Sequence, residues 1–377
     1  MNILILTPGY PYKGNDVFPF VKQLVDEWCR CGNTCVVVVP YAISSFLSFP
    51  PLKETIKYES GGQQVIIRPR YIRASSRGVL LKITDFFKKS AYHRGIRANT
   101  IKSDFVYCHF WNMAEMVKDY TKKNNLPLFV ASGESDIKRI SNPVASDIAS
   151  FISGVVCVST KNRDESISLG LTDMEKCIVL PNSIDNNLFK KMNKEECRDI
   201  LKIPRNIFIV VFVGWFIDRK GSLRVAEAIN NIKDNDVYSI FIGSGNEVPN
   251  CSNILFKGQL PHTEIPLYLN SADVFVLPTK AEGCCNAVIE AMACGLPIIS
   301  SNKPFNWDVL DETNSILIDP ENVAEITDAI ITLRDDKEKR ELLSKGAINK
   351  AKDLTIQQRA SKILEFVNNK KNELSKS

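Results

Sequence analysis

Two glutamates, Glu282 and Glu290, stand eight positions apart in the segment LPTKAEGCCNAVIEAMACGLPIIS, residues 277–300. A carboxylate accepts two hydrogen bonds at once, which suits the neighbouring hydroxyls of a sugar or a ribose. Glu282 precedes a turn, and Glu290 is expected about one turn inside the helix that follows. We therefore expect them to bind the two polyol ends of one ligand rather than to form an acid and base pair.

The residues between the glutamates predict the start of a helix. DVFVLPT is typical of a strand, and AVIEAMAC is a run of good helix formers that Gly295 ends. The first backbone N–H groups of a helix have no partner within it and attract phosphate. Here they belong to Asn286, Ala287 and Val288, so the sequence predicts a phosphate site between the two carboxylates.

Two cations are expected at the same edge of the sheet. In VFVGWFIDRKGSLRVAEAI a strand ends at Gly214 and a helix begins at Ser222, which leaves Arg219 and Lys220 in the crossing. Arginine can hold two oxygens of a diphosphate while lysine supplies a point charge. A solvated basic turn is the alternative. A diphosphate site with a carboxylate on either side is the arrangement expected for binding a nucleoside diphosphate sugar.

Length and composition limit the class of protein. The chain has 377 residues, of which 44% are hydrophobic and 24% charged, and this predicts about two globular domains. No apolar run approaches the roughly 20 residues of a membrane span. The opening NILILTP lacks the features of a signal peptide, so we expect a first strand and a cytoplasmic protein. Eleven scattered cysteines, with no C-x-x-C pair, are interpreted as buried thiols.

The order of the elements predicts an α/β fold. Continuous apolar runs rich in Val and Ile alternate with helix-length segments, which indicates parallel sheets covered on both faces. The alternation breaks in a polar stretch at 178–206 and then restarts. We predict two doubly wound, Rossmann-like domains, 1–180 and 181–355, facing a cleft. A terminal amphipathic helix, 356–377, could cross back to the first domain.

Positive charge is concentrated in residues 68–102, where ten Lys or Arg stand against one acidic residue, Asp85, for a net charge of +9. Apolar residues repeat there at helical spacing: Val79, Leu80, Ile83, Phe86, Phe87 and Ala91. Lys82, Lys88 and Lys89 lie off this stripe. A basic amphipathic helix binds an anionic membrane surface or an anionic acceptor. Alternatively, the stripe packs on the sheet and the lysines are solvated.

The motifs resemble those of one enzyme family. E-x7-E followed by AMACGLPII, together with G-x4-R-K-G, FIGSG and LPNSID, is similar to the retaining glycosyltransferases of family 4, which have the two-domain GT-B fold. The likeness extends from LTPGYPYKGN to the terminal helix. It implies transfer of a sugar from a UDP or GDP sugar to an acceptor hydroxyl.

The resemblance also implies residue roles. It implies that Glu282 binds the donor sugar and that Glu290 binds the ribose. Arg219 and Lys220 would bind the leaving diphosphate. It places the further donor contacts at Gly14, Asn15, Gly214, Gly243, Gly283, Cys284, Cys285, Asn286, Ala287 and Val288. Cys284, Cys285 and Asn286 would face the sugar and shape specificity.

The chain departs from the family pattern in its first half. The first loop has one glycine, Gly14, where the family often has two. Many members have a His-Gly-Ser-Asp sequence whose histidine lies near the sugar, but this chain reads SGESD, with Gly133 at the histidine position. We expect the neighbouring Glu134, or His109 in YCHFW, to supply a polar group there. A buried structural histidine is the alternative for His109.

The expected reaction needs no metal and no cofactor besides the donor. Asp234-Asn235-Asp236 precedes a strand instead of following one, which is a poor position for a Mg-diphosphate site. The rivals are a nicotinamide-dependent dehydrogenase, which would want G-x-G-x-x-G after the first strand, and a sugar-binding module, which would not need Arg219 and Lys220.

The resemblance and the basic segment together suggest a biological role. We expect a peripheral membrane enzyme of cell-surface polysaccharide synthesis, such as that of lipopolysaccharide, with a glycan or lipid-linked oligosaccharide as acceptor and no nucleic-acid partner. A soluble acceptor is the alternative.

Overall fold

The computed structural model describes residues 1–12, 17–43, 50–74, 79–137, 147–233 and 236–374. The chain divides into two compact units. Unit 1 comprises Met1–Val158, Asn162–Leu180 and Arg359–Ser377, and unit 2 comprises Ser159–Lys161 and Pro181–Gln358. The predicted loop residues Gly14 and Asn15, and the pair 234–235 of the Asp-x-Asp sequence, lie outside the described residues.

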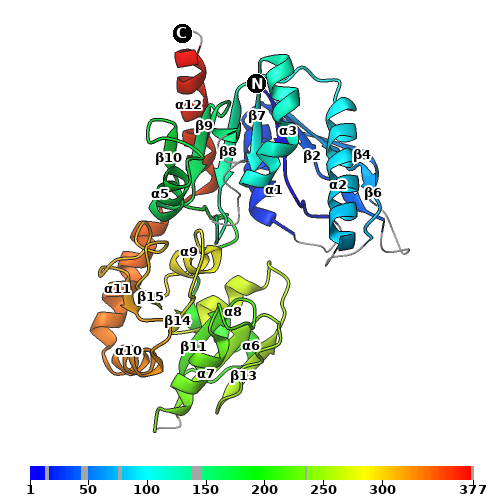
Figure 1. Cartoon of the computed structure of the whole chain (residues 1–377). Coiled ribbons are helices and arrows are strands. Elements are labelled where there is room, and N and C mark those ends of the chain that lie inside the picture. The colour runs from blue at the N-terminus through cyan, green and yellow to red at the C-terminus, as the bar shows by residue number, and fades with distance from the viewer. Residues whose placement is uncertain (13–16, 44–49, 75–78, 138–146, 234–235, 375–377) are drawn as a thin grey trace. The chain divides into compact units, whose positions relative to one another are not determined.

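An eight-stranded sheet forms the centre of unit 1 (Figure 1). In spatial order its strands are β10 (Cys177–Val179), β9 (Gly154–Cys157), β8 (Leu128–Ser132), β7 (Phe105–His109), β1 (Asn2–Leu6), β2 (Thr34–Val38), β5 (Gln63–Ile67) and β4 (Lys53–Lys57). Neighbouring strands are parallel, except β4, which runs antiparallel to β5. A small parallel sheet pairs β3 (Tyr41–Ala42) with β6 (Arg70–Tyr71). β7 and β8 are buried throughout and β1 is buried after Asn2, as expected where helices cover both faces.

Helices pack on both faces of this sheet because alternate strand residues point to opposite sides. The helices of unit 1 whose full bounds are described are α1 (Pro19–Arg30), α2 (Val79–Arg97), α3 (Trp111–Asn124) and most of α5 (Thr160–Ser168) and α12 (Ile356–Leu374). Tyr92 of α2 and Trp111 of α3 belong to one core cluster. The ring of Phe366 in α12 lies 6.1 Å from that of Phe129 in β8, and Trp28 of α1 donates a hydrogen bond to a carbonyl of α12. The terminal helix therefore packs on unit 1.

Unit 2 contains a second, fully parallel sheet of six strands. In spatial order they are β13 (Ile254–Gly258), β12 (Val237–Ile242), β11 (Phe208–Val213), β14 (Val274–Leu277), β15 (Ile298–Ser301) and β16 (Ser315–Ile318). The helices of this unit are α6 (Lys194–Leu201), α7 (Ser222–Asn230), α8 (Ile265–Ser271), α9 (Asn286–Ala293), α10 (Val323–Asp335) and α11 (Lys337–Ala351). The predicted α/β class with two doubly wound sheets is confirmed.

Candidate functional site

The predicted cations and the first glutamate lie where the strand order of unit 2 reverses. From β11 the sheet extends through β12 and β13 on one side and through β14, β15 and β16 on the other. Open parallel sheets bind ligands outside the carboxyl ends of their strands at such a switch point. The loop after β11 carries Arg219 and Lys220, and the loop after β14 carries Glu282. The topology therefore brings these three residues to one edge.

Glu282 is the centre of a polar network there. Its Oε1 atom lies 2.6 Å from Nη1 of Arg219 and 2.6 Å from Nζ of Lys220. The hydroxyl of Thr279, 3.0 Å away, donates to the same oxygen. The side chains of Glu282 and Lys220 are only 12% and 11% exposed. The sequence assigned the cations and the carboxylate to different parts of a ligand, whereas here they also pair with one another.

Lys220 remains a cation in this network. Burial alone would lower its pKa, but Cys285 and Glu282 favour the charged form, and the balance raises the pKa above its ordinary value. Arg219 and Lys220 face one carboxylate, so the three groups carry a net charge of +1. That surplus charge lies against the start of α9 and favours an anion at this place.

The N-terminus of α9 adjoins Lys220. Cys285 is the N-cap residue, without a side-chain cap hydrogen bond, and its thiol lies 4.0 Å from Nζ of Lys220. Burial raises the pKa of this thiol, although Lys220 and the amides of Val288 and Ala287 oppose the rise. The amides predicted to bind phosphate and the predicted diphosphate cation therefore share one location.

Asn182 fixes the turn that precedes α9. Its Nδ2 atom donates to Oδ1 of Asn286 at 2.7 Å and to the carbonyl of Cys284 at 3.1 Å. The side chains of Cys284 and Cys285 are buried, so Asn286 is the more accessible of the three residues expected to shape sugar specificity. Asn182 was not among the predicted site residues, although it stands in the LPNSID segment that carried part of the resemblance.

Glu290 lies within α9 and contacts a histidine. Nε2 of His262, in the loop between β13 and α8, is 2.9 Å from Oε1 of Glu290. The imidazole in turn lies against the ring of Phe189, with 5.0 Å between the centroids. His262 therefore fixes the orientation of the carboxylate. His262 could not be predicted as a site residue, because no spacing signal links a lone histidine in a loop to Glu290, 28 residues away.

Two of the predicted donor-binding glycines have a packing role. Gly243 has a φ of +153°, and a Cβ atom there would lie 1.9 Å from the carbonyl oxygen of Gly214. Only glycine permits this approach between the loops after β11 and β12. The loops are further joined by a hydrogen bond from the amide of Phe216 to the carbonyl of Ser244. Donor contacts from Gly214, Gly243 and Gly283 stay a prediction.

His109, at the end of β7, has the properties of a core residue. It is 4% exposed, and its ring contacts those of Tyr107 and Phe20. Burial, and then the charge of Arg359, lower its pKa to about 3. A neutral imidazole with this environment fits the structural alternative better than an acid or base role.

Glu134 caps the N-terminus of α3. One carboxylate oxygen accepts the amide hydrogen of Trp111 at 2.7 Å, and the other accepts that of Gly133 at 3.0 Å. The N-cap residue of the helix, Phe110, provides no side-chain hydrogen bond. Burial raises the pKa of Glu134 to about 7, even though the amides of Trp111 and Gly133 oppose the rise. This placement gives Glu134 a structural task, and its role near a donor sugar stays a prediction.

The raised pKa of Glu134 predicts a pH-dependent stability. The native carboxyl group retains its proton at pH values where the unfolded one, with a pKa near 4.5, has lost it, so stability declines between about pH 4.5 and pH 7. Glu134→Gln removes this contribution. The free energy of unfolding of the wild type relative to the variant should fall by on the order of 1–2 kcal/mol between pH 5 and pH 7.5 in urea titrations. A difference in unfolding free energy between wild type and variant that stays constant from pH 5 to pH 7.5 would contradict the raised pKa of Glu134.

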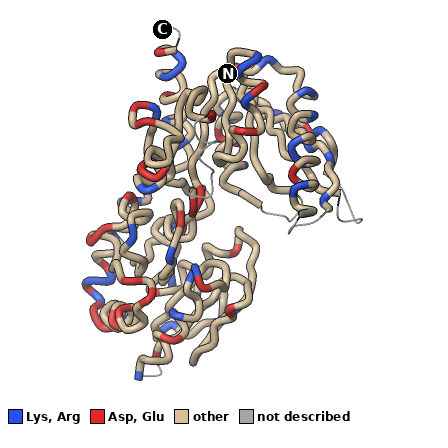
Figure 2. Tube along the Cα trace, viewed as in Figure 1, with Lys and Arg blue, Asp and Glu red and all other residues tan. Residues whose placement is uncertain are grey.

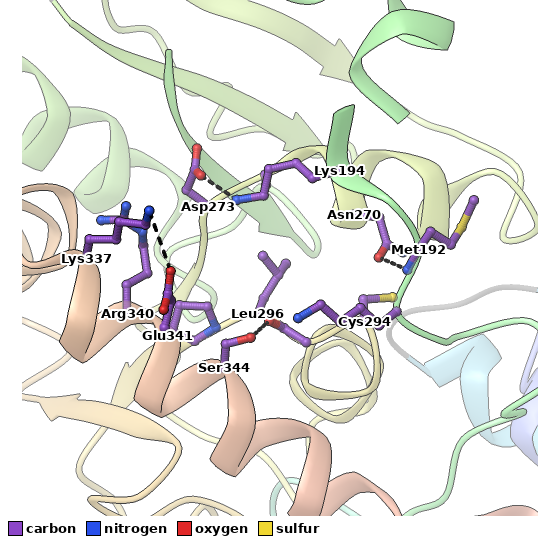
Figure 3. A pocket seen from close by; sticks show the side chains of 14 residues that line it. Met192, Lys194, Asn270, Asp273, Cys294, Leu296, Lys337, Arg340, Glu341 and Ser344 are labelled. Carbon is purple, nitrogen blue, oxygen red and sulfur yellow. Dashed lines mark hydrogen bonds and ion pairs between the residues drawn. The ribbon is translucent and has the colours of Figure 1, made fainter. Parts of the chain in front are cut away.

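A cavity in unit 2 lies away from this site. Its lining includes Asn270 and Asp273, which precede β14, and Leu296, which precedes β15, so it opens at the amino ends of the strands (Figure 3). Lys194 bridges to Asp273 at 2.6 Å within it. None of the predicted site residues lines this cavity.

Two further findings concern the described residues only. Among them, no three His, Cys, Asp or Glu side chains gather as a group that could hold a metal ion. None of the helices described is long and apolar enough to cross a bilayer. The expectation of a reaction without metal stays a prediction.

Comparison with known proteins identifies the family. The profile described as "Glycosyl transferases group 1" matches residues 193–350. A protein of Bacillus subtilis named for teichuronic acid biosynthesis, the glycosyltransferase TuaC, is 32% identical over an alignment of 364 positions that covers 88% of this chain and 88% of that protein. An Escherichia coli UDP-Gal:alpha-D-GlcNAc-diphosphoundecaprenol alpha-1,3-galactosyltransferase is 30% identical over an alignment of 213 positions that covers 52% of this chain and 54% of that protein.

Solved structures show the same architecture. Sucrose-phosphate synthase from Thermosynechococcus elongatus matches with a TM-score of 0.78 at 18% identity over 100% of both chains. HepE of Anabaena, in complex with UDP and glucose, matches with a TM-score of 0.71 at 16% identity, over 98% of this chain and 100% of that one. The chain therefore belongs to the group 1 glycosyltransferases and has the GT-B fold, with parallel sheets in two Rossmann-like domains.

Proposed function

We propose that this glycosyltransferase is a retaining enzyme of family 4 that takes its sugar from a UDP or GDP sugar bound at the switch point of unit 2. The observation that carries the proposal is the convergence of Arg219, Lys220 and Glu282 beside the start of α9. A net positive charge next to a helix N-terminus suits a diphosphate. Family membership sets aside the dehydrogenase and the sugar-binding module.

The proposed mechanism depends on stabilising the departing diphosphate. Negative charge develops on the leaving phosphate as the anomeric bond breaks, and Arg219, Lys220 and the amides of Ala287 and Val288 stabilise it. Glu282 accepts hydrogen bonds from hydroxyls of the sugar. The acceptor hydroxyl attacks from the face that the diphosphate leaves and passes its proton to a phosphate oxygen, which retains the configuration.

Glu290 is proposed to bind the ribose, with His262 as its positioning residue. Replacing His262 with alanine frees the carboxylate to rotate, so the KM for the donor should rise about tenfold, with kcat changed less than threefold. His262→Asn, which keeps a donor group, should restore part of the loss. Steady-state kinetics of the three proteins test this, and a fall in kcat at unchanged KM would contradict it.

The acceptor is proposed to be a glycan or a lipid-linked oligosaccharide used for a cell-surface polysaccharide. The two relatives support this through their names, which mention teichuronic acid biosynthesis and a diphosphoundecaprenol acceptor. We place the reaction at the cytoplasmic face of the membrane, where such an acceptor would be anchored. A soluble acceptor is the alternative.

A donor screen followed by product analysis tests the proposal. The enzyme should hydrolyse either UDP sugars or GDP sugars. The anomeric configuration of the product, read from NMR coupling constants, should be that of the donor. Matched acceptors with and without a lipid diphosphate separate the two acceptor classes. An inverted product, or no hydrolysis of any UDP or GDP sugar, would refute the proposal.

A further inference from the structure

The outer face of helix α2 carries exposed apolar and basic side chains together. Ile83 and Phe86 are exposed on this face, and Phe86 reaches 69%. Leu80 and Leu81 are exposed too, but at 100° per residue they lie on other sides of the helix. The helix is instead attached to unit 1 by Thr84, Ala91, Tyr92 and Ile96, which are buried. Of the predicted stripe, Ala91 is buried as the packing alternative expects, whereas Leu80, Ile83 and Phe86 are exposed and do not pack on the sheet.

Cations flank the exposed apolar residues. At 100° per residue, Lys82, Ile83, Phe86, Lys89 and Arg97 fall on the same side of the helix. Lys82, Lys89 and Arg97 are exposed, and blue segments follow α2 in Figure 2. The acidic groups close by are Asp85 on the helix, Glu115, which is 3.8 Å from Lys89, and Asp119, whose charge acts on His93. The five residues of the face itself include three cations and no carboxylate.

Lys88 differs from its neighbours. Its side chain is half-buried, and burial lowers its pKa. The exposed pair Lys82 and Lys89 is therefore better placed to meet an external surface than the sequence-adjacent pair Lys88 and Lys89.

We propose that this face of α2, formed by Lys82, Ile83, Phe86, Lys89 and Arg97, binds an anionic phospholipid bilayer. Lysine and arginine at the level of the headgroups attract anionic lipid, and the apolar residues between them bury their side chains at the acyl boundary. A soluble anionic glycan would satisfy the charges but would leave Ile83 and Phe86 in water. The combination of side chains therefore favours a bilayer. This inference concerns where the proposed function takes place and does not depend on the identity of the donor.

Vesicle flotation of the intact protein tests the inference. The wild type should float with vesicles of phosphatidylglycerol and phosphatidylcholine but not with phosphatidylcholine alone, and added salt should weaken binding. The double substitution Lys82→Glu and Lys89→Glu should lower the partition constant at least about tenfold, and Phe86→Ser should lower it about threefold or more. Donor hydrolysis without acceptor, measured in parallel, should remain within twofold of the wild type.

Helix α11 provides matched controls. Lys337 and Lys345 are exposed there, so their double substitution by glutamate makes the same change in net charge, and Leu342, 64% exposed, matches Phe86. Neither Lys337→Glu with Lys345→Glu nor Leu342→Ser should alter flotation. The inference is overturned if the α11 controls lower partition as much as the α2 variants, or if either α2 variant leaves it unchanged. It is equally overturned if the protein binds a soluble anionic polysaccharide and no vesicle. If the wild type does not hydrolyse any donor, that result would instead count against the proposed function.

Discussion

Replacing Glu282 with alanine is expected to lower kcat/KM for donor hydrolysis by about 10²–10³-fold. The substitution removes the proposed contact with the sugar hydroxyls, and it also deprives Arg219 and Lys220 of the carboxylate that lies 2.6 Å from each. Since Lys220 is nearly buried, an unpaired ammonium there should also destabilise unit 2 by about 1–3 kcal/mol. Steady-state kinetics and thermal unfolding of the same preparation measure the two effects.

Glu321 provides the control for this substitution. Its exposed carboxylate pairs with Lys280 at 2.9 Å in the same unit. Because exposed ion pairs contribute little, Glu321→Ala should leave both kinetics and stability nearly unchanged. Glu282→Gln keeps the size of the side chain, so it separates loss of charge from loss of packing. Wild-type turnover in Glu282→Ala with a folded protein would contradict the proposed site.

Replacing Lys220 with methionine is expected to lower kcat by about 10²–10³-fold with a smaller change in KM. The charge of Lys220 would matter most when the diphosphate departs, because negative charge on the leaving oxygen is greatest in the transition state. Methionine keeps most of the apolar stem, so the buried packing of the side chain is largely retained. Single-turnover and steady-state rates of donor hydrolysis distinguish chemistry from product release.

Lys280 is the matched lysine outside the proposed contacts. It lies in the loop after β14, with Nζ 3.0 Å from Asp218 and 2.9 Å from Glu321. Lys280→Met should retain kcat within about twofold. A Lys220→Met variant that raises KM while kcat is preserved would show that the lysine binds the donor equally in the ground state and the transition state, against a role specific to the departing diphosphate.

The sequence predicted most of the fold because buried parallel strands are continuous apolar runs. FIVVFV and FVYCH, for example, became β11 and β7. Several strands were not predicted, among them two at sheet edges. β4, KETIK, is an antiparallel edge strand with alternating exposure, and β16, SILI, is short and partly exposed at the other sheet's edge. Neither has the continuous apolar pattern that marks a central strand.

The candidate site was predictable where residues follow adjacent strands. Arg219, Lys220 and Glu282 come together because the loops after β11 and β14 must meet at one sheet edge. Asn182 and His262 reach the site from loops far away in sequence, and side-chain orientation decides their contacts. Sequence spacing does not reveal side-chain orientation. Of these two residues, only Asn182 lies in a motif that the sequence had already indicated, LPNSID.

The orientation of α2 shows a further limit of pattern reading. An apolar stripe at helical spacing fits both a buried face and an exposed one. The sequence therefore left two alternatives open. Tertiary packing selected Tyr92 and Ile96 for the core and left Ile83 and Phe86 outside.

The central claim is that unit 2 binds a nucleoside diphosphate through Lys220, the start of α9 and Glu290. Isothermal titration of the wild type, Lys220→Met, Glu290→Ala and the control Lys280→Met with UDP, GDP and NAD tests it most directly. We predict that UDP or GDP binds one site in the wild type and the control, that both site variants weaken binding at least about tenfold, and that NAD does not bind. Nucleoside diphosphate binding that neither variant changes, or NAD binding in its place, would contradict the account.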